Sequence, residues 1–120
     1  MSDIRAGTIS DAAGTGPITM TKQSPAKAWV NFNGVGTVAI RDSFNVASIT
    51  DVATGVQEVN YTNNFANVGY AACASSTAGG ATHFTTNVYT NSTVRTTTSG
   101  SSGNASDAGI VTVAANGDLA

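Results

Sequence analysis

Residues 27–40 read KAWVNFNGVGTVAI, and this stretch decides the fold. Apolar and polar side chains alternate from Ala28 to Phe32, which is typical of a half-buried β-strand. The pair Asn33-Gly34 follows, and it favours a type I′ turn between two antiparallel strands. The residues from Val35 to Ile40 are then expected to form the returning strand. The stretch therefore predicts a β-hairpin at the start of a β-rich domain.

Short strand patterns recur along the rest of the chain, with turn residues between them. Helix propensity is poor, because the chain has a single Leu and a single Glu and no window holds the apolar spacing of an amphipathic helix. The expected strands cover residues 44–50, 56–61, 68–74, 83–90, 92–97 and 110–114. Within 56–61, Val59 and Tyr61 are expected to face one way, and Glu58 and Asn60 the other. The pattern predicts an all-β fold, a compact antiparallel β-sandwich of about eight short strands.

The 120 residues suit one domain preceded by an arm. Residues 1–26 carry few large apolar side chains and are expected to form an extended N-terminal arm for attachment or subunit contact, with a strand near 18–22. Residues 27–120 are expected to form the sandwich. Much of its apolar content is Ala and Val, which bury less area than larger side chains. We therefore expect the chain to gain stability from neighbouring copies.

Charge and targeting patterns exclude several classes of protein. Charged residues make up 10% of the chain, its formal net charge is −2, and its five basic residues are scattered, so nucleic acid is not an expected partner. The start of the chain lacks the features of a secretory signal, and no stretch is long and apolar enough for a membrane helix, so no membrane insertion is expected. Cys73 is the single cysteine. It excludes an intramolecular disulfide and, among small apolar neighbours, is predicted to be a core residue.

Two strings of residues, KAWVNFNG at 27–34 and VAIRDSFNVASITD at 38–51, resemble a module of bacteriophage tail-fibre proteins. The run GVQEVNY at 55–61 is similar to the next strand of that module, and VAANGD at 113–118 to its last strand and turn. ISDAAGTGP at 9–17 is similar to the segment that often precedes it. The resemblance lapses between about 62 and 110. It implies the C-terminal β-sandwich module of a receptor-binding fibre, usually trimeric.

The function that the resemblance implies is attachment. We expect a virion structural protein of a tail fibre or fibre tip, made in the cytoplasm of the host bacterium. The implied partners are two further copies in a homotrimer, other phage tail or fibre proteins bound through the arm, and a host surface glycan or outer-membrane protein. The alternative is a virion component that binds no receptor, such as a capsid decoration protein, a head fibre or a tail adaptor.

No catalytic machinery is expected. His83 is the only histidine and has no motif around it, and Asp42 and Asp51 stand where turns are expected. We therefore predict no enzyme activity and no cofactor. One His and one Cys cannot form a zinc site within the chain. An ion held by His83 from each of three subunits is the one metal alternative.

Loops are the expected place for receptor contact, because strands supply the scaffold and loops carry recognition. The loop 62–67 offers Asn63, Asn64 and Phe65, an apolar ring among amides. The loop 75–83 ends in His83 and Phe84. A third loop, 98–107, has almost no large side chains, and all three loops are alternatively plain solvated turns.

Trp29 has two interpretations. It either stacks on a sugar or anchors the sandwich or a contact between subunits, and its place in an alternating strand favours the anchoring role.

Overall fold

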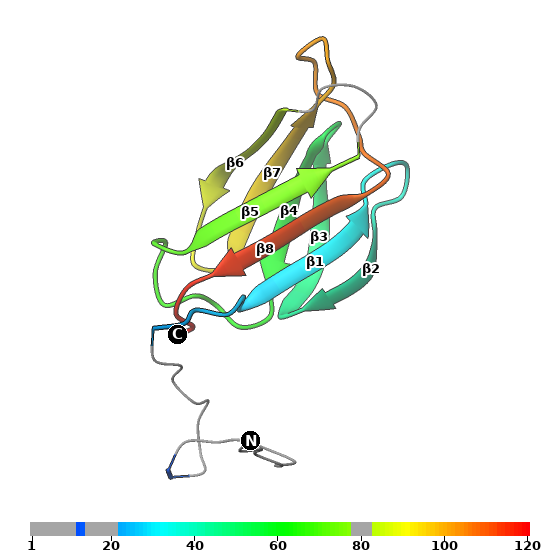
Figure 1. Cartoon of the computed structure of the whole chain (residues 1–120). Coiled ribbons are helices and arrows are strands. Elements are labelled where there is room, and N and C mark those ends of the chain that lie inside the picture. The colour runs from blue at the N-terminus through cyan, green and yellow to red at the C-terminus, as the bar shows by residue number, and fades with distance from the viewer. Residues whose placement is uncertain (1–11, 14–21, 78–82) are drawn as a thin grey trace, which may run out of the picture.

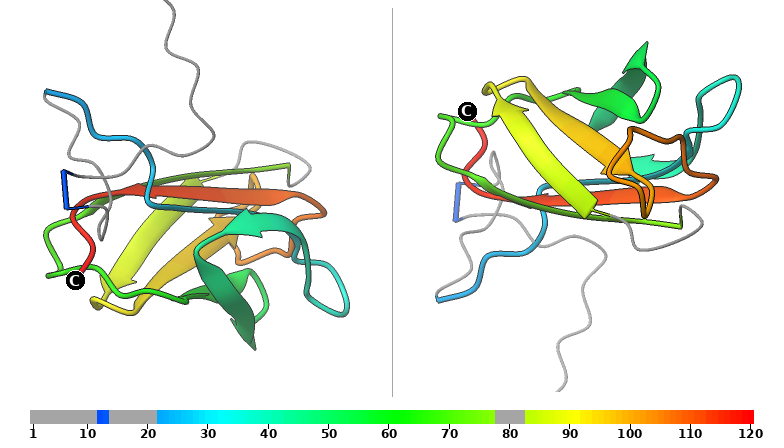
Figure 2. Two further views of the ribbon diagram at one scale, coloured as in Figure 1. Left: turned by 90° about the horizontal axis from the view of Figure 1, so that it is seen from below. Right: turned by 90° about the horizontal axis from the view of Figure 1, so that it is seen from above.

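A computed structural model of the protein describes residues 12–13, 22–77 and 83–120, and only the backbone of 83–88. The described residues contain no helix. Their strands are β1 (Ala28–Asn33), β2 (Ala39–Phe44), β3 (Val46–Ala53), β4 (Val56–Tyr61), β5 (Ala71–Ser76), β6 (His83–Tyr89), β7 (Thr93–Ser99) and β8 (Val111–Asn116). They form two antiparallel sheets, with strand orders β2-β1-β8-β5 and β3-β4-β7-β6. The sheets lie face to face as two layers (Figures 1 and 2), which confirms the predicted sandwich.

The core lies between the two sheets and follows the alternation of the strands. In β1, Val30 and Phe32 are buried and point inward, and Trp29 points outward. In β4, Val59 and Tyr61 are buried, whereas Glu58 and Asn60 are only half-buried. The predicted facing of these four residues is confirmed. The buried apolar side chains are Ala28, Val30, Phe32, Val59, Tyr61, Phe65, Tyr70, Val94, Ala108, Val111, Val113 and Ala115.

The first hairpin differs from the prediction. The strand β2 begins at Ala39, so five residues rather than two connect it to β1. Asn33 does not have the left-handed backbone that a type I′ turn requires, and the left-handed residue is Gly36, with φ 66°. The backbone N–H of Gly34 instead donates to the carbonyl oxygen of Ala108, at 2.9 Å. The predicted tight turn at Asn33-Gly34 is therefore wrong, because this long-range contact fixes Gly34.

A sharp corner at Asn45 divides the predicted strand 44–50. Phe44 ends β2 in one sheet, and Val46 begins β3 in the other. Asn45 adopts φ 56°, a left-handed conformation that Asn tolerates better than most residues. Its side chain fixes the corner, because Nδ2 donates to the Lys27 carbonyl at 3.0 Å and Oδ1 accepts from the Asn63 N–H at 2.7 Å. A single residue thus passes the chain between layers.

Other strand boundaries shift by a few residues. The strand β3 continues to Ala53, so the predicted turn at 51–55 shortens to Thr54-Gly55. The strand β5 covers Ala71–Ser76 rather than 68–74, and β7 extends to Ser99. The strand β8 is displaced by one residue at its start and two at its end, whereas β4 occupies the predicted range.

The chain enters the sandwich beside the end of β8. The N–H of Lys27 donates to the Ala115 carbonyl at 2.8 Å, and Asn116 Nδ2 donates to the Ser24 carbonyl at 2.8 Å. Residues 22–26 are exposed. Most of the predicted arm, including nearly all of its strand at 18–22, lies outside the described residues.

Candidate binding surface on the outer face of the first sheet

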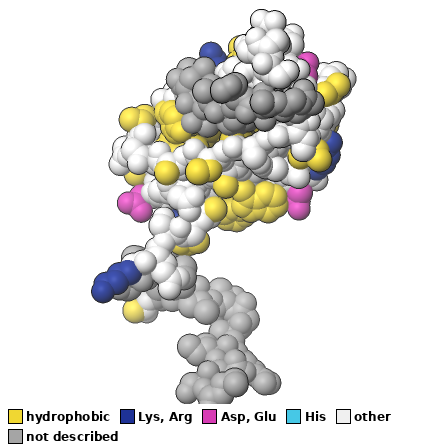
Figure 3. Space-filling view, turned by 45° about the horizontal axis from the view of Figure 1, so that its top comes forward, with side chains coloured by type: hydrophobic (Ala, Val, Ile, Leu, Met, Phe, Trp, Pro, Cys, Tyr) yellow, Lys and Arg dark blue, Asp and Glu magenta, His cyan; other side chains and the backbone are white. Residues whose placement is uncertain are grey.

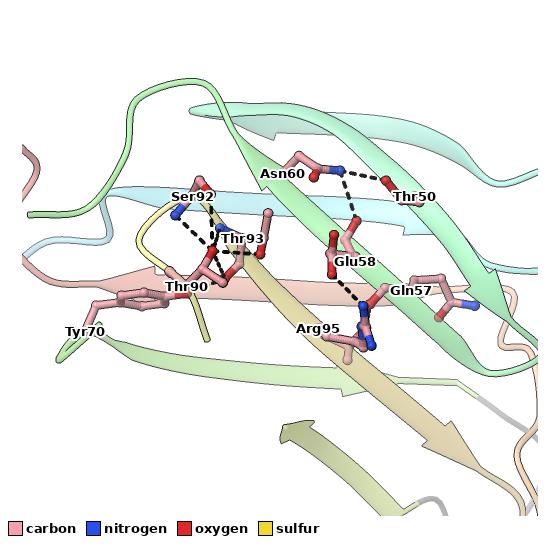
Figure 4. Close-up of polar contacts among 10 residues, drawn as sticks. Thr50, Gln57, Glu58, Asn60, Tyr70, Thr90, Ser92, Thr93 and Arg95 are labelled. Carbon is pink, nitrogen blue, oxygen red and sulfur yellow. Dashed lines mark hydrogen bonds and ion pairs between the residues drawn. The ribbon is translucent and has the colours of Figure 1, made fainter. Parts of the chain in front are cut away.

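The two outer faces of the sandwich differ in chemistry. On the β3-β4-β7-β6 sheet, outward polar side chains bind one another (Figure 4). Arg95 Nη2 lies 2.9 Å from Glu58 Oε2, and Asn60 Nδ2 donates to Thr50 Oγ1 at 3.0 Å. These four side chains therefore have partners within the protein.

The outer face of the β2-β1-β8-β5 sheet carries two large aromatic rings. Trp29 of β1 pairs directly with Phe44 of β2 and, on its other side, with Ala114 of β8. Ala114 pairs with Cys73 of β5. Directly paired residues lie on the same face, so these four form an apolar row across the sheet. Trp29 is 38% exposed and Phe44 is 55% exposed.

A second row, two residues further along the strands, is polar. It consists of Asp42, Asn31, Thr112 and Ser75, paired in that order. The hydroxyl groups of Ser75 and Thr112 lie 2.7 Å apart and form a hydrogen bond. Arg41 Nη1 donates to Asn31 Oδ1 at 3.3 Å, and Arg41 Nη2 donates to the Gly109 carbonyl at 2.6 Å. Hydrogen bonds within the protein thus fix the side chains of Asn31, Thr112 and Ser75 in the polar row.

A shallow hollow of about 460 Å³ lies between the rows, and the side chains of both rows that line it are Trp29, Asn31, Cys73, Ser75, Thr112 and Ala114. Ala114 is the small residue between Trp29 and Cys73 on neighbouring strands, so it leaves space beside the indole ring. Figure 3 shows a mostly polar surface on which hydrophobic side chains gather in patches. The arrangement is suited to binding, with an aromatic wall, hydroxyl groups and an amide on a rigid sheet.

One prediction about a single residue is wrong, and another is wrong in part. Cys73 is exposed rather than in the core, because Ala72 and Ala74 are the inward residues of β5. Trp29 does not anchor the interior of the sandwich, because its strand neighbours Ala28 and Val30 occupy the inward positions. Its predicted role in a contact between subunits stays a prediction. The alternation of residues 28–32 contains this signal, since Trp29 is out of phase with Val30 and Phe32.

The loop 62–67 is part of the scaffold. Phe65 is fully buried, so its predicted position on a receptor-binding surface is wrong. Asn63 is held by Asn45, whose Oδ1 accepts from the backbone N–H and from Nδ2 of Asn63, at 2.7 and 3.1 Å. Asn64 is exposed, and its carbonyl accepts from the N–H of Ala120 at 2.9 Å. The structure therefore does not bring these three side chains together on the surface.

The other predicted candidates lie at the far end of the sandwich. His83 and Phe84 begin β6 and pair with Ser99 and Thr98 at the end of β7. Phe65 lies near the start of β7, where its N–H donates to the Asn91 carbonyl at 2.8 Å. The two predicted sites are thus at opposite ends of the β6–β7 hairpin. The side chains of His83 and Phe84 lie outside the described part of the structure.

Titratable groups of the interior are phenols. Burial raises the pKa of Tyr61 above its ordinary value, and the neighbouring Tyr70 raises it further. Burial also raises the pKa of Tyr70. Over residues 12–13, 22–77 and 83–120, no three His, Cys, Asp or Glu side chains are grouped to hold a metal ion. The same residues include no helix long and apolar enough to cross a membrane.

Comparison with known proteins gives no match to this chain. No protein-family model matches it, no curated protein does, and no solved structure does.

Proposed function

We propose that the chain is a structural protein of a bacteriophage virion, in a tail fibre or fibre tip, and that it mediates attachment to the bacterial host by binding rather than by catalysis. The resemblance of residues 27–34 and 38–51 to tail-fibre modules supports the location in a fibre. One structural observation supports attachment: the aromatic outer face of the β2-β1-β8-β5 sheet.

Exposed aromatic rings on this face favour an interaction surface. Trp29 and Phe44 lie side by side in register. Clustered exposed apolar side chains commonly mark binding sites, and Trp is enriched among the residues that contribute most to binding energy. The opposite outer face, in contrast, pairs Glu58 with Arg95 and Asn60 with Thr50. The difference between the faces favours contact through the β2-β1-β8-β5 sheet.

The site proposed for contact is a rigid sheet rather than a loop. The strands β1 and β8, which carry Trp29 and Thr112, occupy the centre of their sheet. Both rows are fixed by strand register, so the contacting groups keep their spacing without a ligand. The loop 62–67 belongs to the scaffold, because its Phe65 is buried in the core.

The proposed assembly is a homotrimer that other tail or fibre proteins hold through residues 1–26. The protein is made in the cytoplasm of the host bacterium and then becomes part of the virion. Light scattering over a range of concentrations tests the assembly: a trimer has about three times the 12.0 kDa mass of one chain. A monomer at every concentration contradicts the trimer.

Two measurements test location and attachment. Gold-labelled antibodies against the protein are expected to mark fibre tips of phage particles in electron micrographs. Host cells incubated with the purified protein are expected to adsorb the phage several-fold more slowly, and heat-unfolded protein is the control. Label on the capsid with unchanged adsorption contradicts the proposal and supports a decoration protein.

A further inference from the structure

The hollow between the apolar and polar rows combines two kinds of binding group. The indole ring of Trp29 forms one wall, and the amide of Asn31 and the hydroxyl group of Thr112 belong to the opposite row. A sugar ring has the same two sides, an apolar C–H face and an edge of hydroxyl groups. Aromatic rings stack on the C–H face, and amides and hydroxyls bind the edge.

The polar row retains hydrogen-bonding capacity for a ligand. Asn31 uses Oδ1 to accept from Arg41, and no described residue accepts from its Nδ2. Ser75 and Thr112 share one hydrogen bond, in which either hydroxyl is the donor. Among the described residues, the second hydroxyl proton of this pair and several lone pairs then have no partner. Donors and acceptors are thus both present, as a hydroxyl-rich ligand requires.

The charge of the hollow favours a neutral ligand. Its lining includes no Asp, Glu, Lys, Arg or His residue. The charged side chains beside it are on the edge strand β2, where Asp42 pairs with Asn31 in the polar row and Arg41 is bound to Asn31 and to the Gly109 carbonyl. A nucleic acid or an acidic polysaccharide would require unpaired cations on this face.

The exposed aromatic area is small for a contact between protein copies. Trp29 and Phe44 are 38% and 55% exposed, so the two rings offer roughly 200 Å², given about 150–250 Å² for a whole aromatic side chain. A stable protein interface buries about 800 Å² on each partner. A contact between copies would therefore have to include other residues of the sheet, whereas the two rings alone match the area of a few sugar rings.

We infer that the outer face of the β2-β1-β8-β5 sheet binds a neutral glycan, and this inference rests on the proposed attachment function. One sugar ring stacks on Trp29, and its hydroxyl groups bind Asn31, Thr112 and Ser75. Phe44, on the other side of Trp29, extends the platform for a neighbouring sugar. The ligand class is therefore a neutral surface polysaccharide of the host.

The chain carries two natural reporters at this site. Trp29 is its single tryptophan and Cys73 its single cysteine, and both line the hollow. A bound sugar is expected to change the fluorescence of Trp29 and to slow the alkylation of Cys73 by a maleimide. Both signals come from residues of the wild-type protein, so no reporter residue has to be introduced.

The test screens the full chain against an array of neutral oligosaccharides of hexoses and N-acetylhexosamines, with uronic-acid oligosaccharides for comparison. Neutral oligosaccharides that bind are then titrated with both reporters. Trp29→Ala is expected to weaken array binding at least about tenfold. Ala114→Leu, which fills the hollow and leaves Trp29 in place, is expected to have the same effect. Asn60→Ala, on the opposite face, is the matched control and is expected to bind as the wild type does.

Three results would overturn the inference: no neutral oligosaccharide binds, only acidic ones bind, or Ala114→Leu binds as well as the wild type. Conversion of a trimer into monomers by Ala114→Leu would assign the face to contact between copies instead. The adsorption assay distinguishes failure of this inference from failure of the proposed function. If the wild type and Ala114→Leu slow phage adsorption equally, attachment stands and the glycan face does not.

Discussion

The rings of Phe65 and Tyr70 stack with their centroids 4.2 Å apart and an angle of 17° between their planes. Tyr61 meets both rings edge-on, at 5.0 and 5.8 Å, and Tyr89 lies 5.1 Å from Tyr70. An aromatic cluster therefore closes the end of the sandwich at which β7 begins. The cluster fixes the loop 62–67, which its polar composition alone predicts to be exposed to solvent.

Phe65→Ala is expected to lower the free energy of unfolding by about 3–5 kcal/mol, because it removes a fully buried ring and leaves a cavity. Urea unfolding followed by circular dichroism measures the loss. Phe44→Ala is the matched control, and it should cost less than about 1 kcal/mol because the ring is largely exposed. Equal losses in the two variants would contradict the core position of Phe65.

Tyr70→Phe is expected to destabilise the fold by about 1–2 kcal/mol. The Tyr70 hydroxyl donates to the carbonyl oxygens of Thr90 and Thr93, at 3.0 and 2.9 Å, across the β6–β7 turn. The substitution keeps the stacked ring and leaves these acceptors without that donor. Thermal and urea unfolding give the difference from the wild type.

Tyr61→Phe is the matched control for that variant. The Tyr61 hydroxyl is buried, and no hydrogen bond of normal geometry joins it to a described residue. Its removal is expected to leave stability unchanged or slightly higher, since a buried polar group without a partner is unfavourable. A larger loss for Tyr61→Phe than for Tyr70→Phe would reverse the assignment of these hydroxyl groups.

The part of the fold that the sequence predicts best depends on local patterns. The strand 56–61 is correct to the residue, because its side chains alternate and Gly55 precedes it. The tight turn at Asn33-Gly34 is wrong, because the contact between Gly34 and Ala108 comes from a distant loop. Local turn propensity contains no information about that contact.

Predicting the candidate site required facts that the sequence does not contain. Trp29, Ala114 and Cys73 meet only because β1, β8 and β5 are neighbours in one sheet, although they are far apart in the chain. Alternation within residues 28–32 does place Trp29 outward. The burial of Phe65 has no local signal, since its partner Tyr70 lies beyond a polar loop.

Stability is expected to fall in alkaline solution. Burial raises the pKa of Tyr61 and of Tyr70 above the ordinary phenol value of 10.0. A phenol with a raised pKa in the folded state contributes its full stability below pH 10 and loses it as the pH rises further. The free energy of unfolding should therefore be level up to about pH 9 and then fall, by at most about 1.4 kcal/mol per pH unit for each such tyrosine.

Urea unfolding between pH 7 and 11 measures this dependence, and Tyr61→Phe is expected to reduce the alkaline slope. A surface substitution such as Asn60→Ala should leave the slope unchanged. The same slope in Tyr61→Phe as in the wild type would show that Tyr61 does not contribute to it.

Gly55→Ala is expected to destabilise the fold far more than Gly36→Ala. Both glycines have left-handed backbones, with φ of 68° and 66°. A Cβ atom at Gly55 would lie 2.5 Å from the Thr98 carbonyl oxygen and 2.6 Å from the Ser106 nitrogen, whereas a Cβ at Gly36 would meet nothing within 4 Å. The Gly55 N–H also donates to Asp107 Oδ1 at 2.6 Å, so the turn cannot move away without loss of that bond.

The Gly36 variant should lose only the cost of a left-handed alanine, about 1–2 kcal/mol. The Gly55 variant adds a backbone clash and is expected to lose more than about 3 kcal/mol. Urea unfolding of the two variants in parallel isolates the clash, because the backbone strain is common to both. Equal losses would mean that Thr98 of β7 and the loop 100–110 move away from Gly55 at little cost, and that the contacts of Gly55 with Thr98 and Asp107 do not hold this end of the sandwich together.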